Sequence, residues 1–581
     1  MSYPRRPHLA SFALSNLASG AFAAAIALGV SGCGHGTRSG APASAMPTVA
    51  SPIATAVAAK PAAFALKLLG AYQHDGFKVS AAEIPAFDPF SKRLLVVNAQ
   101  AGGVDVLDGS DMAAPKLIQF LDVGALVEKQ LTLADGTCGG VNSVAVANGA
   151  CAVAIEAKVK TDPGWVAFFR CSDLAPLGVV QVGAMPDMLG FSPDGTKVGV
   201  CNEAEPAKGY AVNPPGSVSI ISITISSGFA APTVAHAVFT AWDAGGSRQG
   251  EVAALVAAGL RYNTVAGATA TFSQDVEPEY LAWSADGSTC YVTLQENNAI
   301  AVIAAASATV TAIRPLGFKD HGVAGNELDL SDREVDGTKA SGGRIDIRTW
   351  PGVVGAYLPD GIAACDIAGR TYLVTANEGD SRESGELKDE AEVADLGTLT
   401  GPLAGLAGPQ QLGRVVVLKD LSTTSKLVLF GARSFSIWDA ATGAQVWDSG
   451  SELERLIAKL HPANFNADHT APTLDNRSDN KGPEPEGVAV ATIDGRTCAF
   501  IGLERSGGIA VYDITTPTAP TFVTYRNDRD FAATPAAGVG GHLGPEGLVV
   551  VPANQSPTRT TLLIVGNEVS GSTVIYEITK G

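Results

Sequence analysis

The feature that most constrains this chain is a repeated unit that recurs from residue 83 to the C-terminus. Each copy has an acidic or amide residue, a short apolar strand, often a tight turn, a second strand ending in polar residues, and a third strand. The clearest copies begin at Glu279, Asp360, Glu486 and Glu546, and weaker copies begin at Glu83, Asn142 and Asp187. Repeats built from short strands and turns are typical of radial all-β folds. The sequence therefore predicts an all-β protein, a β-propeller of about seven four-stranded blades.

The segments between copies supply the remaining strands. Pro176–Val182, Thr309–Leu316 and Pro520–Tyr525 each follow a third strand and have strand-like patterns. The last copy has no such successor, because the chain ends at Gly581. Phe64–Gln73 precedes the first copy and resembles these outer strands. We therefore expect this N-terminal strand to complete the last blade and close the ring.

The copies are unevenly spaced, which indicates insertions within a single domain over 63–581. The long intervals contain Ala230–Val276, Lys319–Leu358 and Gly379–Gln411, which we expect to cover one face of the disc. A further hairpin, Ser434–Asp439 with Gln445–Asp448, could belong to an eighth blade.

The N-terminus has the pattern of an export signal. Arg5 and Arg6 precede an uncharged stretch that ends in Val30-Ser-Gly-Cys33, which resembles the lipobox of bacterial lipoproteins. This pattern predicts a signal peptide over 1–32, a lipid on Cys33 and a flexible tether over 33–62. An ordinary signal peptide or a transmembrane anchor is the alternative. The protein is then exported and held in the bacterial cell envelope, with the lipid as its contact with the membrane.

Charge and cysteine content narrow the partners and the chemistry. The net charge of −18 argues against nucleic acid as a partner and is compatible with cations. Seven cysteines follow Cys33, so they cannot all form pairs. Cys151 and Cys171 could meet across adjacent strands of one blade, with Cys138 as a competitor.

Several longer motifs carry a family resemblance. They are QDVEPEY (Gln274–Tyr280), YLPDGIAA (Tyr357–Ala364), YLVTANEGDSRE (Tyr372–Glu383), GARSFSIWD (Gly431–Asp439), KGPEPEG (Lys481–Gly487), GLERSGGIAVYD (Gly502–Asp513) and LGPEGLVV (Leu543–Val550). In these segments the chain resembles the bacterial choice-of-anchor I proteins and is similar to mesenchyme-specific cell-surface glycoproteins. The resemblance implies a surface propeller with a variable anchor, and some members of the family are described as alkaline-phosphatase-like.

The acidic positions of the repeat predict a functional face. In a propeller blade, the start of the first strand and the end of the second lie on the same face. The first-strand starts supply six acids: Glu83, Asp187, Glu279, Asp360, Glu486 and Glu546. The second-strand ends supply Glu156, Glu203, Glu296, Glu378, Glu504 and Glu568. We therefore expect twelve carboxylates to converge on one end of the propeller, the innermost near its axis.

Carboxylates this close require compensation by cations, arginines or backbone N–H groups. Oxygen-rich clusters suit Ca²⁺, and no histidine has the spacing of a zinc site. The predicted calcium ligands are Glu83, Asp187, Glu279, Asp360, Glu378, Glu486, Glu504, Glu546 and Glu568. The alternative is architectural, with each acid accepting hydrogen bonds from a turn. A further acidic segment, 475–480, lacks the spacing of an EF-hand, and we expect a solvated loop there.

Two functions remain open. The first is a surface module whose metal-ordered face binds a ligand or an envelope partner, and we favour it. The second is a calcium-dependent phosphoester hydrolase in which metal ions activate water. No nucleophile motif is present, so His542 is the acid–base candidate, and Arg382 and Arg505 are candidates for binding phosphate.

Overall fold

The computed structural model describes residues 64–580, except 225–228, 263–269, 339–342, 386 and 537. The predicted signal peptide, Cys33 and the tether lie outside the described residues. Within the described part, none of the helices is both long enough and apolar enough to cross a bilayer.

Seven antiparallel four-stranded sheets make up most of the described chain. Five of them are built from consecutive strands: β2 (Pro85–Asp88), β3 (Arg93–Asn98), β4 (Gly103–Asp108) and β5 (Lys116–Leu121); β6 (Cys138–Ala147), β7 (Ala150–Ala157), β8 (Pro163–Arg170) and β9 (Pro176–Ala184); β10 (Pro186–Phe191), β11 (Lys197–Asn202), β12 (Ser217–Thr224) and β13 (Ala230–Val238); β14 (Pro278–Trp283), β15 (Thr289–Leu294), β16 (Ala299–Ala304) and β17 (Thr309–Pro315); β29 (Pro485–Ile493), β30 (Arg496–Leu503), β31 (Ile509–Asp513) and β32 (Thr521–Arg526).

The other two sheets contain strands that are distant in sequence. They are β20 (Ile362–Ile367), β21 (Arg370–Asn377), β27 (Ser434–Asp439) and β28 (Gln445–Asp448); and β33 (Pro545–Val551), β34 (Leu562–Asn567), β35 (Ser572–Lys580) and β1 (Phe64–Gln73). The hairpin β27–β28 therefore does not start another sheet; it supplies the outer half of the sheet that β20 and β21 begin. Likewise, Ala230–Val238 is a fourth strand and not an insertion.

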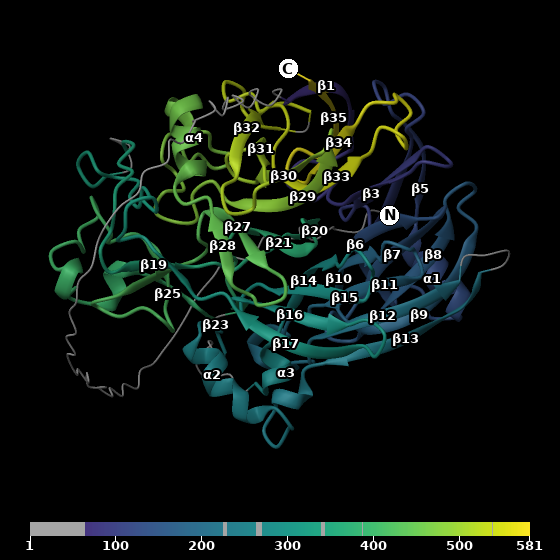
Figure 1. The fold of residues 1–581 in the computed structure, drawn as a ribbon, viewed down its shortest axis with the longest axis horizontal. Helices are drawn as coiled ribbons and strands as arrows, with labels where there is room; N and C mark the ends of the chain where they lie inside the picture. Colours follow the sequence, from purple (N-terminus) through teal and green to yellow (C-terminus); the bar gives the residue numbers. More distant parts are fainter. Residues whose placement is uncertain are drawn as a thin grey trace, which may run out of the picture.

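The sheets follow one another around a common centre (Figure 1). The first strand of each sheet packs against the first strand of the next, in the cyclic order β2, β6, β10, β14, β20, β29, β33 and back to β2. At the outer edge of the last sheet, β1 pairs antiparallel with β35, from Phe64 opposite Lys580 to Gln73 opposite Ser572. This radial arrangement of four-stranded sheets is a β-propeller.

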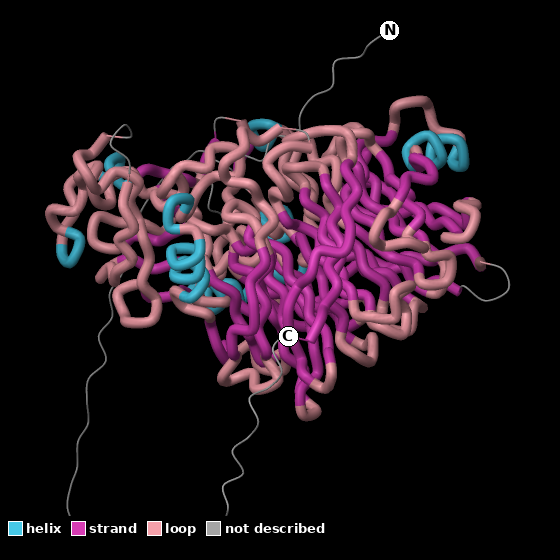
Figure 2. The backbone as a smooth tube through the Cα atoms, turned by 90° about the horizontal axis from the view of Figure 1, so that it is seen from above, coloured by secondary structure: helices cyan, strands magenta, loops and turns pink. Residues whose placement is uncertain are grey.

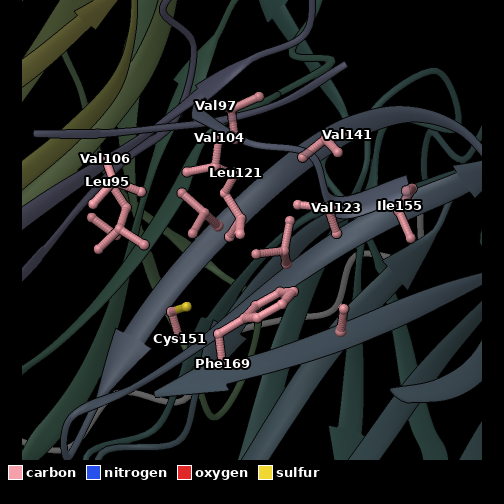
Figure 3. Close-up of a cluster of buried hydrophobic side chains, with 14 of the residues drawn as sticks. Leu95, Val97, Val104, Val106, Leu121, Val123, Val141, Cys151, Ile155 and Phe169 are labelled. Carbon is pink, nitrogen blue, oxygen red and sulfur yellow. The ribbon is translucent and has the colours of Figure 1, made fainter. Parts of the chain in front are cut away.

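The hydrophobic core lies between neighbouring sheets. In one cluster, Leu95, Val97 and Val106 of the first sheet face Cys151 and Phe169 of the second (Figure 3). Helix α1 (Val123–Leu131) joins these two sheets, and its N-terminal cap is Asp122, whose carboxylate accepts a hydrogen bond from the N–H of Ala125. The inner strands such as β3, β7 and β11 are buried on both faces, so each repeat needs a neighbour on either side.

The insertions form a smaller lobe beside the sheets. It contains a five-stranded sheet of β18 (Phe318–Asp320), β19 (Val353–Ala356), β26 (Leu427–Leu429), β25 (Val416–Leu418) and β24 (Glu390–Glu392). A hairpin of β22 (Glu383–Ser384) and β23 (Leu387–Lys388) lies apart from this sheet, against the 3-10 helix Lys208–Tyr210. The remaining α-helices of the described chain are α2 (Val252–Ala257), α3 (Phe272–Asp275) and α4 (Glu452–Leu460). Loops and short helices gather above and to the left of the strands in Figure 2.

Candidate metal-binding cavity at the centre of the propeller

The acidic residue at the start of a repeat lies in a local break of the strand ladder. In four sheets the register shifts between a proline and the residue three positions later, and the acid falls inside this interval. The four segments are Pro186–Leu189, Pro278–Leu281, Pro485–Val488 and Pro545–Leu548. Proline has no N–H to donate to the ladder, and a bulge redirects the side chains within it. At these four positions the break in the ladder thus allows the carboxylate to point away from the sheet, and all four acids line the central cavity described next.

A cavity of ≈ 190 Å³ occupies the centre, and all seven four-stranded sheets contribute to its wall. Its lining includes one residue at or just before the first strand of each sheet: Ile84, Asn142, Asp187, Glu279, Asp360, Glu486 and Glu546. Five of these seven are acids and one is an amide, so most of this ring offers oxygen atoms.

A second cavity of ≈ 160 Å³ adjoins the first, since Glu279, Asp360 and Glu486 line both. Acids at second-strand ends, Glu378, Glu504 and Glu568, line this second cavity. Its remaining wall comes largely from inserted segments, including Asp380, Ser381, Glu390, Asn480 and Lys481. The insertions thus form part of the wall of the second cavity.

Carboxylate oxygens from different sheets come within 4.8 Å of one another in three groups of this region. The groups are Glu83, Glu546 and Glu568; Asp360, Glu378 and Glu486; and Glu378, Glu484 and Glu504. The structure therefore brings all nine predicted calcium ligands to this region. Seven of them are members of the three groups, and the other two, Asp187 and Glu279, line the cavities. The structure adds Glu484, which the repeat pattern did not single out.

Burial and mutual repulsion make the ring acids resist ionisation. Burial, followed by neighbouring carboxylates, raises the pKa of Glu279, Glu486 and Glu546 well above the usual range. Burial also raises the pKa of Asp187, to about 6. A bound cation would relieve both effects, because it replaces lost hydration and opposes the negative charge.

Several oxygen atoms in the two cavities have no hydrogen-bond partner. They are Oε2 of Glu279, Glu486 and Glu546, and Oε1 of Gln295, whose side chain is fully buried. The amide of Gln295 donates to Oε2 of Glu378 at 3.0 Å, which leaves its oxygen as a free acceptor. Buried oxygens without donors are costly unless a cation or water meets them. This donor set of carboxylates and an amide fits Ca²⁺.

Basic side chains compensate part of the charge. Lys481 Nζ lies 2.5 Å from Glu378 Oε1 and 3.4 Å from both Asp380 Oδ1 and Glu484 Oε2. Arg505 Nε lies 3.0 Å from Glu484 and 3.1 Å from Glu504. Although burial opposes ionisation of Glu484, Arg477, Arg505 and Lys481 together hold its pKa well below the usual range. Lys481 and Glu484 belong to the motif KGPEPEG, which was the signal available in the sequence.

The three residues predicted as catalytic lie in different surroundings. Arg505 lines the second cavity. Arg382 is buried against Asp275 and Glu277, at 3.1 and 2.9 Å, and lines neither cavity. His542 is half-buried, contacts Ser572 Oγ at 2.9 Å and also lines neither cavity. Of the three, the geometry therefore brings only Arg505 to the acidic centre.

The expectation of a solvated loop at 475–480 is wrong. Asp475 and Ser478 are fully buried, and Arg477 and Asp479 are 8 % and 7 % exposed. These side chains are held inside the lobe by Arg477–Glu484 and Arg414–Asp479 ion pairs, which sequence spacing did not reveal.

Comparison with known proteins places the chain in a family. The sequence model of the choice-of-anchor I domain matches residues 83–517. The chain belongs to the choice-of-anchor I family. In this protein the match to the choice-of-anchor I domain begins at Glu83, the first acid of the repeat, and extends past Glu504.

Two curated relatives of this choice-of-anchor I protein are from animals. Gigasin-3a of Magallana gigas is 32% identical over 187 residues, which are 30% of this chain and 64% of the relative. Mesenchyme-specific cell surface glycoprotein of Strongylocentrotus purpuratus is 29% identical over 286 residues, 42% of this chain and 35% of the relative. The chain thus spans less than two thirds of the length of either relative.

Solved structures with a similar fold include two propeller domains. The Neurospora crassa Pan2 WD40 domain has a TM-score of 0.40 at 10% identity, over 89% of this chain and 96% of that chain. The β-propeller domain of Myceliophteria thermophila Cps50 (Swd1) has a TM-score of 0.41 at 9% identity, over 89% of this chain and 100% of that chain.

Proposed function

We propose that this choice-of-anchor I protein is an exported, lipid-anchored surface protein whose central acidic cavity binds Ca²⁺ and so orders a face for ligand or partner binding. The observation that supports the metal is the set of buried oxygens without partners on Glu279, Gln295, Glu486 and Glu546. The surface location is supported by family membership, by the name of the sea-urchin relative and by the export pattern before Cys33.

Calcium would join sheets that are far apart in sequence. The ring residues come from separate repeats, so a single ion coordinated by two or three of them would connect different blades at the centre. The insertions that wall the second cavity would then present a fixed surface around the ion. This arrangement suits recognition of a ligand, since a rigid site loses less conformational entropy on binding.

The test measures thermal stability of the mature protein in EDTA and in CaCl₂. A ligand that binds the folded state adds about 2.7 kcal/mol to the free energy of unfolding at a hundredfold excess over Kd. We expect CaCl₂ to raise Tm in the parent and not in a Glu486→Gln/Glu546→Gln variant. A Glu251→Gln/Glu392→Gln variant is the control, because these side chains are 45% and 48% exposed and line neither cavity. No shift in the parent protein would mean that the acids are architectural.

A calcium-dependent phosphoester hydrolase is the second candidate. It is favoured by the presence of Arg505 and Lys481 in the same cavity as the unpartnered carboxylates, since cationic side chains and metal ions together bind phosphate. The assay is hydrolysis of phosphomonoesters and phosphodiesters with CaCl₂ present. Activity that is lost in Glu486→Gln/Glu546→Gln and reduced in Arg505→Ala would favour the enzyme. Calcium binding without hydrolysis would favour the binding protein.

A further inference from the structure

A separate group of acids lies in the inserted lobe, outside both central cavities. Asp329, Glu334 and Asp475 place one carboxylate oxygen each within 4.8 Å of the others. Asp329 and Glu334 lie between β18 and β19, whereas Asp475 lies between α4 and β29. The group therefore joins two segments that are about 140 residues apart in sequence, by the count between 334 and 475.

These carboxylates are buried without a basic partner. Asp329 and Asp475 are fully buried, and Glu334 is half-buried. Among the described residues, none of the three forms an ion pair with a lysine, arginine or histidine. The buried arginine of this region, Arg433, instead pairs with Glu454 at 2.6 Å and donates to the carbonyl oxygens of Asp329 and Ser478.

The unused oxygens of the group point to a ligand. Oδ2 of the fully buried Asp475 and Oε1 of Glu334 receive no hydrogen bond from an N–H or hydroxyl group outside the three acids. The same holds for Oδ1 of Asn466, an uncharged and fully buried side chain. Asn466 is linked to the group, because its amide donates to Ser478 Oγ at 2.9 Å and Ser478 in turn donates to Asp475 Oδ1.

The remaining oxygens are fixed by backbone donors. Asp329 accepts hydrogen bonds from the N–H groups of Ser331 and Asp346, and Glu334 accepts one from Arg344. Gly343 packs directly against Asp475, since a Cβ at this position would lie 1.9 Å from Asp475 Oδ2. These contacts leave one oxygen of Glu334 and one of Asp475 without a donor from outside the group, and without a cation the two carboxyls hydrogen-bond to each other.

We propose that Asp329, Glu334 and Asp475 bind a Ca²⁺ ion that fastens the 329–334 segment to the 465–480 segment. A hard divalent cation is the ligand that matches three carboxylates and a nearby amide oxygen, with no sulfur or imidazole in the group. The ion would also help to fix part of the wall of the central cavity. Asn480 and Lys481, which line that cavity, follow Asp475 by only five and six residues.

The experiment counts bound calcium in the mature protein after EDTA treatment and dialysis, by isothermal titration with CaCl₂ and by elemental analysis. Asp475→Asn should bind one equivalent fewer than the parent, whether or not the central cavity binds calcium. Glu486→Gln/Glu546→Gln should keep that lobe equivalent. The matched control is Asp346→Asn, because Asp346 lies in the same insertion but its carboxylate faces Arg348 at 3.3 Å.

A second readout separates metal binding from a defect in folding. In EDTA, Asp475→Asn should melt no lower than the parent, because it leaves one acid fewer in a buried group that has no basic partner. Glu334→Gln, at a less buried position, should also lose the equivalent and serves if Asp475→Asn does not fold. Equal calcium content in the parent, Asp475→Asn and Glu334→Gln would overturn the proposal, and so would a parent protein that binds no calcium.

Discussion

Lys481 acts as a built-in cation of the central cavity. Its ammonium group contacts three carboxylates there, those of Glu378, Asp380 and Glu484. These contacts raise the pKa of Lys481 well above its usual value, although burial opposes the charge. A calcium ion beside Glu378 would therefore compete with this side chain for the same oxygens.

Replacing Lys481 by methionine should separate these two effects. In EDTA we expect Lys481→Met to lose about 3 kcal/mol of unfolding free energy, because a buried ion pair is broken from one side. In titrations with CaCl₂ the same variant should bind calcium several times more tightly than the parent. Lys459→Met, on the exposed side of α4, is the control. Unchanged or weaker calcium affinity would place the ion away from Lys481.

Cys151 and Cys171 are positioned to form a disulfide in an oxidising compartment. Both are fully buried, and a hydrogen bond with Cys151 is the main cause that raises the pKa of the Cys171 thiol. Cys138 lies opposite Ala157, six residues along β7 from Cys151, or about 20 Å at the usual rise per residue. It therefore does not compete for either thiol.

We expect the protein isolated from the cell envelope to contain this disulfide. Mass spectrometry of peptides cut without reduction should link the two segments, and iodoacetamide should not modify either cysteine in the denatured, unreduced protein. The cytoplasmic product of a chain lacking residues 1–33 is the control, since both thiols should be modified there. Two alkylated thiols in the exported protein would contradict the prediction.

Strand β1 is the one element that joins the two ends of the described chain. It pairs with β35 over its whole length and buries Phe64 and Leu66 in the core shared with Tyr576 and Ile578. Without β1, the edge of β35 would be unpaired and open to association with other chains.

A chain that begins at His74 should therefore aggregate and melt well below one that begins at Pro61. A point variant tests the same contact without cutting the chain. Leu66→Ala should cost about 2–4 kcal/mol, because the side chain is 6% exposed, whereas Leu68→Ala, at 39% exposed, should cost less than about 1 kcal/mol. β1 would contribute little to stability if the two point variants were equally stable and the chain beginning at His74 melted like the longer one.

The elements that the sequence predicted well are those with a repeated pattern. The strands that follow Glu279, Glu486 and Glu546 lie where alternation and turns placed them, and the all-β propeller fold is confirmed. The hairpin β27–β28 was harder to assign, because 56 residues separate β21 from β27 and hide their pairing. Long-range pairing of this kind is set by packing, which local pattern does not encode.

The repeat also predicted the acids of the central site, but it did not predict the residues that inserted segments bring there. Acids such as Glu486 and Glu546 recur at one position of the repeat, so topology alone gathers them at one end. Lys481, Gln295 and Asp475 belong to no repeated position, and their roles depend on inserted segments that fold back onto the ring or onto each other. Only the three-dimensional arrangement reveals which acids are compensated and which are not.

The proposed lipid anchor concerns the whole molecule, and its predicted site is Cys33, which lies outside the described residues. Cys33→Ser should block lipid attachment, so the protein should leave the membrane fraction or accumulate with its signal peptide uncut. The measurement is fractionation followed by mass spectrometry of the N-terminal peptide. Ser31→Thr, a conservative change in the same segment, is the control. A Cys33→Ser protein that stays in the membrane fraction with an unchanged N-terminus would exclude the lipid anchor.

The dependence of stability on pH follows from the sum of the central acids. Burial raises the pKa of Asp187 to about 6 and that of Glu205 to about 7, against about 4 in an unfolded chain. Glu205 is a neighbour of Glu203, which lines the first cavity. Between pH 4 and 7 the folded state then holds more protons than the unfolded state. The free energy of unfolding that these groups contribute in EDTA is therefore present below pH 4 and is lost as pH rises to 7.

Calcium should reverse this trend, because it binds the ionised carboxylates and displaces their protons. Buried histidines change stability with pH in the opposite direction, because burial lowers the pKa of His321 to about 3. The quantity to compare is therefore the difference in Tm between CaCl₂ and EDTA at each pH. We expect the rise in Tm caused by calcium to be small at pH 5 and to grow steadily to pH 7.5. The Glu486→Gln/Glu546→Gln variant should show a weaker growth, and NaCl at equal ionic strength should not reproduce it. A calcium effect of the same size at pH 5 and pH 7.5 would mean that the ion does not replace protons on the central carboxylates.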